Sequence, residues 1–394
     1  MKHLAEVKNI LSFLLAAGLL GFALAARAQT DIEISKLTLP GQEKPIPVSL
    51  SGFSGEAAAV IQFDLGAQGF KFTAPDAAQY LLSGSNDGNL TGRAQDRLNK
   101  NMLVNKAYTG ATLRRQAHAF VDDFLAALGR KGIGQTKIAY KKSRGSSGEI
   151  HIADFDGFNE QAVTHDGAHV AAPVWVPNRL ALYYTSYRNG NPNIFAHDLT
   201  TGQRSVLAAY AGLNTSAAPS PDGSKVAMIL SKSGSPDVYV CNADGSGLKQ
   251  LTNTKEDESS PCWSPDGQWI CYAGKKDERR ALWKVSPNGG APVRIPTSGV
   301  SSPSEPDWSP DNKWIVFTTT RRGGFDICVV PATGGQATVL VGGEDPSWAP
   351  NSRTVVFANG LSGSRRLSLL DVPTKQVKDV SRISGSNSQP SWAK

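Results

Sequence analysis

The sequence is poor in the features that carry most enzyme chemistry. It has only 4 cysteines and 6 histidines among 394 residues. No G-x-S-x-G segment is present to raise a serine nucleophile on a sharp turn, and neither common glycine-rich phosphate loop is found. His165 and His169 stand four apart in a glycine-containing loop, where we interpret them as solvated side chains. We therefore predict no catalytic residue, no metal site and no cofactor.

Cysteine is too sparse for a disulfide framework. Cys262 and Cys271 fall on the two strands of one predicted hairpin, so an oxidising compartment would permit a cross-strand bridge. The favoured interpretation is nevertheless that Cys241, Cys262, Cys271 and Cys328 are four buried apolar thiols.

Long apolar runs are also scarce, and the one present lies at the start of the chain. Residues 1–28 combine early lysines, the run Ile10–Ala26 and an A-x-A cleavage site at Ala26–Ala28, as a secretory signal peptide does. The alternative, an uncleaved anchor, needs about 20 apolar residues. Cleavage removes three positive charges and one negative one, which lowers the formal net charge from +7 to +5. We expect a periplasmic, monomeric mature chain with no membrane span and no nucleic-acid partner.

What the sequence does contain is a repeat built around a W-S-P-D-G turn. The clearest copy runs from Cys262 to Tyr272, where Pro, Asp and Gly supply a tight turn between two alternating strands. The steps between copies are 44, 44, 45, 40 and 44 residues, the length of a four-stranded propeller blade. The anchor positions of the six copies are Trp175, Pro219, Trp263, Trp308, Trp348 and Trp392.

The two ends of this repeat region are complementary. The first blade has a second strand at Lys137–Tyr140 but no first strand, and the chain ends in Pro390-Ser391-Trp392, a first strand without successors. We predict that the two segments pair and close a six-bladed ring, which leaves no free sheet edge. The alternative is an open sandwich whose strands happen to repeat.

Residues 29–135 read as a small α/β domain. Strands are expected at 46–50, 70–72, 80–84 and 102–107, and helices at 56–64 and 112–128, where Leu113, Ala117, Phe120 and Phe124 form an apolar stripe. The predicted organisation is a signal peptide (1–28), an α/β N-terminal domain (29–135) and an all-β six-bladed β-propeller (136–394).

One face of the predicted propeller carries a charge pattern. The loops between second and third strands are basic and include Arg279, Arg280, Arg321 and Arg322. The crossovers between blades are acidic, at Asp166, Glu256, Asp257, Glu258, Glu305, Glu344 and Asp345. We hypothesise that an acidic mouth inside a basic rim docks a protein of matching charge; the alternative is ordinary solvated loops.

A signal peptide, an α/β domain ending in a helix, and six W-S-P-D-G blades closed by a P-x-W strand resemble the TolB family of the Tol–Pal system. Lys137–Tyr140, the segment Asp154–Asn159 and Leu248–Thr252 carry the local likeness. The resemblance implies a non-enzymatic periplasmic adaptor that binds the Pal lipoprotein on the propeller face and TolA through the mature N-terminal segment, in support of outer-membrane integrity and cell division.

Carried over by position, the resemblance places both contact regions in this sequence. The TolA-like contact would be Gln29, Thr30, Asp31, Ile32, Glu33, Ile34 and Ser35. The Pal-like contact would use crossover residues Asn214, Thr215, Ser216, Ser259, Ser260, Glu305, Glu344 and Asp345. Two departures concern Leu213, where the family often has His, and Ser260, where it often has an acid. The alternatives are a periplasmic binding propeller with another ligand and a propeller lyase or hydrolase.

Overall fold

The computed structural model describes residues 40–276, 278–361 and 363–394. The predicted signal peptide and the segment Gln29–Ser35 therefore lie outside the described residues.

The first part of the described chain is one sheet covered by two helices. The strands are β1 (Ile46–Ser51), β2 (Phe70–Phe72), β3 (Tyr80–Ser85), β4 (Leu90–Asp96) and β5 (Met102–Tyr108), and the helices are α2 (Gly55–Gly66) and α3 (Leu113–Ala127). The strand order is β2-β1-β3-β4-β5. β1 runs parallel to β2 and β3, whereas β3, β4 and β5 form an antiparallel meander.

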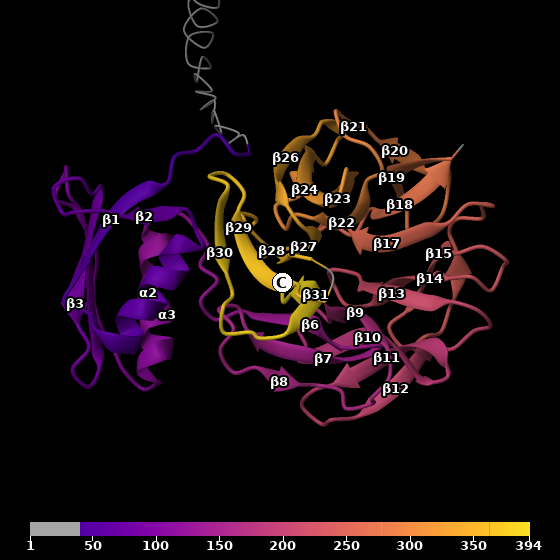
Figure 1. Cartoon of the computed structure of the whole chain (residues 1–394), viewed down its shortest axis with the longest axis horizontal. Coiled ribbons are helices and arrows are strands. Elements are labelled where there is room, and N and C mark those ends of the chain that lie inside the picture. The colour runs from indigo at the N-terminus through magenta and orange to yellow at the C-terminus, as the bar shows by residue number, and fades with distance from the viewer. Residues whose placement is uncertain (1–39, 277, 362) are drawn as a thin grey trace, which may run out of the picture. The chain divides into compact units, whose positions relative to one another are not determined.

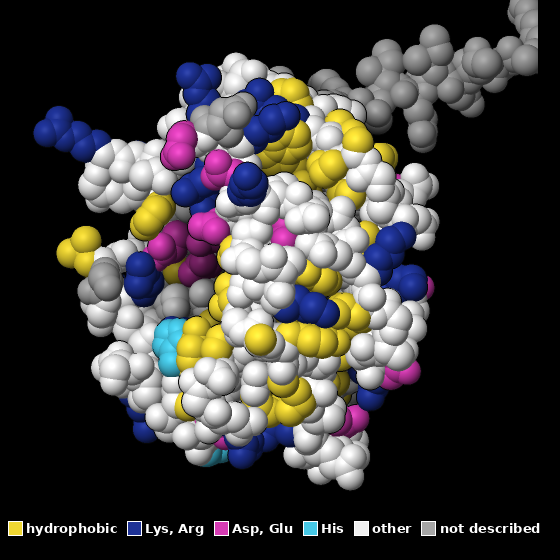
Figure 2. All heavy atoms as spheres, turned by 90° about the vertical axis from the view of Figure 1, so that its right-hand side faces the viewer, with side chains coloured by type: hydrophobic (Ala, Val, Ile, Leu, Met, Phe, Trp, Pro, Cys, Tyr) yellow, Lys and Arg dark blue, Asp and Glu magenta, His cyan; other side chains and the backbone are white. Residues whose placement is uncertain are grey.

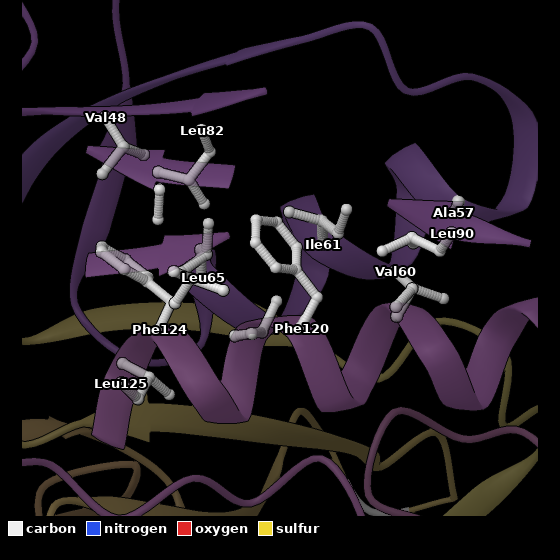
Figure 3. Close-up of a cluster of buried hydrophobic side chains, with 14 of the residues drawn as sticks. Val48, Ala57, Val60, Ile61, Leu65, Leu82, Leu90, Phe120, Phe124 and Leu125 are labelled. Carbon is white, nitrogen blue, oxygen red and sulfur yellow. The ribbon is translucent and has the colours of Figure 1, made fainter. Parts of the chain in front are cut away.

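Helix α3 begins and ends one residue inside the predicted bounds 112–128, and it buries the centre of the predicted apolar stripe. The Thr112 hydroxyl accepts a hydrogen bond from the Arg115 N–H at 3.3 Å and caps the first turn. Phe120 and Phe124 point from α3 toward Val48 and Leu82 of the sheet (Figure 3). All four side chains are almost completely buried, so the stripe is core packing, as predicted.

Six four-stranded antiparallel sheets follow, and Figure 1 shows them arranged in a ring. The first blade combines β31 (Ser386–Trp392), β6 (Lys137–Arg144), β7 (Ser147–Asp154) and β8 (Gln161–Ala162). The second contains β9 (Val170–Trp175), β10 (Ala181–Asn189), β11 (Asn191–Asp198) and β12 (Arg204–Ala208). The third contains β13 (Asn214–Pro219), β14 (Lys225–Leu230), β15 (Asp237–Asn242) and β16 (Lys249–Gln250).

The other three blades have the same plan. The fourth contains β17 (Glu258–Trp263), β18 (Ile270–Lys276), β19 (Arg279–Val285) and β20 (Val293–Ile295). The fifth contains β22 (Ser304–Trp308), β23 (Trp314–Arg321), β24 (Gly324–Pro331) and β26 (Thr338–Gly342), and the sixth β27 (Glu344–Trp348), β28 (Thr354–Asn359), β29 (Arg366–Asp371) and β30 (Gln376–Asp379). A short parallel pair, β21 (Thr297–Ser298) with β25 (Gly335–Gln336), links the outer parts of the fourth and fifth blades.

The ring is closed by the two ends of the repeat region, as predicted. β31 pairs antiparallel with β6, and Trp392 lies opposite Ile138. The Trp392 indole N–H donates to the Thr136 hydroxyl at 2.8 Å, and its ring stacks on Phe155 with centroids 6.2 Å apart. The prediction of a six-bladed propeller closed through the C-terminal strand is thereby confirmed.

The recurring serine and aspartate hold the turn between the first two strands of a blade. In the fourth blade the Ser264 hydroxyl donates to Asp266 at 2.5 Å and accepts from the Trp269 N–H at 2.9 Å. Ser309 and Asp311 repeat this arrangement in the fifth blade. Since Asp266 also accepts from the Gln268 N–H, these hydrogen bonds lower the pKa of its carboxyl group.

A buried polar network joins helix α3 to the first blade. His118 Nδ1 lies 2.7 Å from an oxygen of Asp64 in α2, and the Arg114 guanidinium pairs with Asp156 in the turn after β7. Arg114 also covers the ring of Phe158, 4.2 Å from its centroid. The segment Asp154–Asn159 is a turn, as predicted, because the Gly157 N–H donates to the Asp154 carbonyl at 2.8 Å.

Candidate functional site on the crossover face

The first strands of the six blades surround a central cavity of about 620 Å³. Each of these strands contributes lining residues, from Ala172 in the second blade to Gln389 in the first. In a four-stranded blade the crossovers and the loops between second and third strands lie at one end of this cavity. We call that end the crossover face.

Every one of the six first strands is interrupted by a β-bulge at the same place. The residue three positions before the anchor position has a positive φ between 48° and 55° in all six, although none is glycine. These six bulge residues, all of which line the cavity, are Ala172, Ser216, Ser260, Glu305, Asp345 and Gln389. The ladder register shifts around each of them. Four of the side chains predicted to contact a partner therefore occur at one repeated structural position: Ser216, Ser260, Glu305 and Asp345.

The bulges were not predicted, although the sequence carries a signal for them. A proline follows the bulge residue in five of the six blades, and proline inside an otherwise regular strand marks a bulge or an edge. A bulge aims a side chain out of the regular alternation. The repeated bulge therefore explains why one side chain from each of six separate strands lines the central cavity.

The remaining predicted crossover residues divide into two kinds. Ser259 is half-buried, and its hydroxyl accepts from Arg280 at 3.1 Å. Thr215 is also half-buried and hydrogen-bonded to Thr185 at 3.0 Å. Asn214 is fully buried, and its amide donates to the carbonyls of Tyr210 and Pro192 at 2.8 and 3.1 Å. Asn214 therefore shapes the crossover from inside and is not a surface contact, which corrects the prediction.

The predicted basic rim is partly neutralised within the chain. Arg365 pairs with Glu344, and Arg321 lies 3.0 Å from Asp326. Arg279, at the start of β19, and Arg322, in the turn between β23 and β24, are exposed. Figure 2 shows Lys and Arg side chains in several separate groups on the side in view, while many of the acidic side chains gather in one recess.

The predicted acidic mouth is smaller than its seven carboxylates suggest. Glu258 is only 4% exposed and accepts from the Val238 N–H at 3.2 Å, and burial raises its pKa to about 7. Asp166 is held by Arg204 at 2.9 Å. Glu305 and Asp345 do line the cavity, where burial and the adjacent Glu305 carboxylate raise the pKa of Asp345. Among the predicted carboxylates, those that line the cavity itself therefore come from the fifth and sixth blades, while Asp257 is exposed on the crossover before the fourth.

The family description "TolB beta propeller domain" matches residues 125–394, more than half of the chain. The chain belongs to the TolB propeller family. A curated relative, "Tol-Pal system protein TolB" of Bordetella pertussis (strain Tohama I), is 30% identical over 268 residues, which are 67% of this chain and 60% of that protein. Thus the chain matches less than two thirds of the length of that TolB relative.

Solved structures agree on the fold. TolB from Acinetobacter baumannii matches with a TM-score of 0.81 at 21% identity, over 90% of this chain and 98% of that one. A chain of a nidogen/laminin complex matches with a TM-score of 0.54 at 12% identity, over 66% of this chain and 98% of that one. The first match extends beyond the propeller, so the fold of the preceding sheet and helices is also shared with the Acinetobacter TolB.

In the parts of the chain that the structure describes, no group of three His, Cys, Asp or Glu side chains is placed to hold a metal ion. Over the same residues, no helix has both the length and the apolar character needed to cross a membrane. All four cysteines are buried and unbridged, as favoured from the sequence.

Proposed function

We propose that this protein is a non-enzymatic, periplasmic docking component of a Tol–Pal envelope system. Membership of the TolB propeller family carries the proposal, because curated relatives bear the name of that system. The proposed partners are a Pal-like peptidoglycan-associated lipoprotein at the crossover face and a TolA-like protein at Gln29–Ser35. Through both, the protein would support outer-membrane integrity and cell division.

The geometry of the crossover face supports the first partner. The six bulge residues, five of them polar, lie on the first strands and line the central cavity, and the loops of the crossover face add exposed arginines at Arg279 and Arg322. Rigid, polar surfaces with unpaired charge at the edge favour fast and selective protein association. We also propose the division at residues 135 and 136, since α3 ends at Ala127 and the first propeller strand begins at Lys137.

Binding of the soluble domain of the organism's own Pal-like lipoprotein tests the proposal. Reversal of two rim charges, Arg279→Glu with Arg280→Glu, should weaken binding by roughly tenfold at low salt, because edge charges act on association over about a Debye length. The difference should shrink at high salt. Lys313→Glu is the matched control, since Lys313 is 55% exposed beside the turn at the opposite face. Absence of binding by the unmodified chain would contradict the proposed function.

A further inference from the structure

The backbone N–H groups of the six bulge residues differ in their hydrogen bonding between the two halves of the central cavity. Left-handed backbone is strained at a residue other than glycine, and it recurs here in all six blades. At such a bulge the peptide N–H leaves the regular ladder. It therefore needs another acceptor, and three of the six blades supply one from inside the chain.

The supplied acceptors follow one rule. The Asp345 N–H donates to Glu305 at 3.0 Å, the Gln389 N–H to Asp345 at 2.9 Å, and the Ala172 N–H to Gln389 at 2.9 Å. Each acceptor is thus the side chain of the bulge residue in the preceding blade. In this half of the central cavity, a side-chain oxygen of each bulge residue therefore accepts from the bulge N–H of the next blade.

In the other half of the central cavity, the side chains of the preceding bulge residues are too short to accept from the bulge N–H groups. The bulge residues that precede Ser216, Ser260 and Glu305 are Ala172, Ser216 and Ser260, which end in a methyl or a hydroxymethyl group. Among residues 40–276, 278–361 and 363–394, no side chain accepts from these three N–H groups in the way that Glu305, Asp345 and Gln389 do. We call the N–H groups of Ser216, Ser260 and Glu305 the uncapped amides.

Charge is distributed unequally between the same two halves. The carboxylates of Glu305 and Asp345 already accept from amides on the capped side. The buried Glu258, which precedes Ser259 on the uncapped side, accepts from the Val238 N–H. On the uncapped side, Arg280 reaches the hydroxyl of Ser259, directly beside Ser260. A negative group is therefore better accommodated next to Ser260 than next to Asp345.

We propose that the uncapped amides form a subsite for a carboxylate side chain, Asp or Glu, from a segment of a docked protein. The chain itself supplies the template, since Glu305 and Asp345 place carboxylate oxygens 3.0 and 2.9 Å from the equivalent amides. Backbone N–H groups and a nearby guanidinium both form strong, charge-assisted hydrogen bonds to a carboxylate. The inference rests on the proposed function for the identity of the docked protein.

A titration of the ¹⁵N-labelled full chain with sodium acetate tests the subsite without any partner. Acetate should shift the amide resonances of Ser216, Ser260 and Glu305 saturably, and leave those of Asp345, Gln389 and Ala172 unchanged. Acetamide and sodium chloride at equal concentration separate carboxylate recognition from neutral hydrogen bonding and from ionic strength. Equal shifts at all six amides, or no shift with acetate, would overturn the proposal.

A second experiment supplies the missing acceptor by substitution. Ser260→Glu places a carboxylate where Glu305 stands in the next blade, and the left-handed backbone there already accepts Glu. The variant should lose the acetate response at the Glu305 amide. Ser216→Glu should do the same at the Ser260 amide, which covers the case in which the first variant misfolds. A retained response in both variants contradicts the subsite.

Partner binding distinguishes failure of this inference from failure of the proposed function. Ser260→Glu should weaken binding of the Pal-like soluble domain more than tenfold, while Ser246→Glu, at an exposed turn of the opposite face, should not. Tight binding by Ser260→Glu would refute the subsite and leave the docking function intact. An acetate response without partner binding would support the subsite and reject the Pal-like partner.

Discussion

Closure of the ring through Trp392 makes a large and local energetic prediction. The side chain is 2% exposed and packs with Ile138, Tyr140 and Phe155. Replacement of a buried aromatic by alanine costs about 3–5 kcal/mol, and the lost indole hydrogen bond to Thr136 adds about 1 kcal/mol. We therefore expect Trp392→Ala to lower the free energy of unfolding by about 4–6 kcal/mol.

Two other variants calibrate that loss. Trp392→Phe keeps the stack on Phe155 and removes only the indole donor and part of the volume, so it should cost about 1–2 kcal/mol. Leu98→Ala, at a side chain 73% exposed, should change stability by less than about 0.5 kcal/mol. Denaturant unfolding followed by circular dichroism avoids the change in tryptophan fluorescence. A loss below about 1 kcal/mol for Trp392→Ala would refute closure by this strand.

Three further predictions concern buried polar groups. In the folded protein the pKa of Glu258 is raised from 4.5 to about 7. Its contribution to the free energy of unfolding is therefore full at low pH and falls by at most about 3 kcal/mol as the pH rises from about 4.5 to 7. Glu258→Gln should flatten this part of the stability–pH curve, whereas Asp257→Asn, at the exposed neighbouring residue, should not. Ser264→Ala removes both hydrogen bonds of the turn and should cost about 1–2 kcal/mol in thermal or urea unfolding, with a near-neutral result contradicting the role given to the motif. Asp156→Ala leaves the buried Arg114 with only the partly exposed Glu56, 3.4 Å away, as an ion-pair partner and should cost about 3–5 kcal/mol. Replacing Arg114 and Asp156 together by apolar residues should cost less, and equal losses would argue against a coupled pair.

The propeller could be predicted because the strand and turn signals of each blade lie within one local copy of the repeat. The α/β sheet was predicted less completely. Strand β4 was not anticipated, since Leu90–Asp96 is largely polar and its inward positions alternate Leu90, Gly92 and Ala94, two of them too small to mark a core face. Gly92 is small for a reason: an added Cβ would lie 2.4 Å from the Phe120 ring.

The sequence located the segments of the candidate site, but it did not predict their backbone conformation. The crossover segments were located correctly, yet the left-handed bulges depend on ladder register, which a single strand does not reveal. Likewise, the Arg114–Asp156 pair joins residues from two regions that the sequence separates by a linker. Contacts of this kind arise only when the fold brings distant segments together.

Hydrogen exchange of the full chain, alone and with the Pal-like soluble domain, tests the docking function most directly. Amides of residues 213–216, 258–260 and 304–305, together with the loops at Arg279–Arg280 and Arg321–Arg322, should exchange more slowly in the complex. The turns at Pro221–Gly223 and Pro265–Gly267, on the opposite face, should be unchanged. Protection confined to those turns, or spread evenly around the ring, would contradict docking on the crossover face.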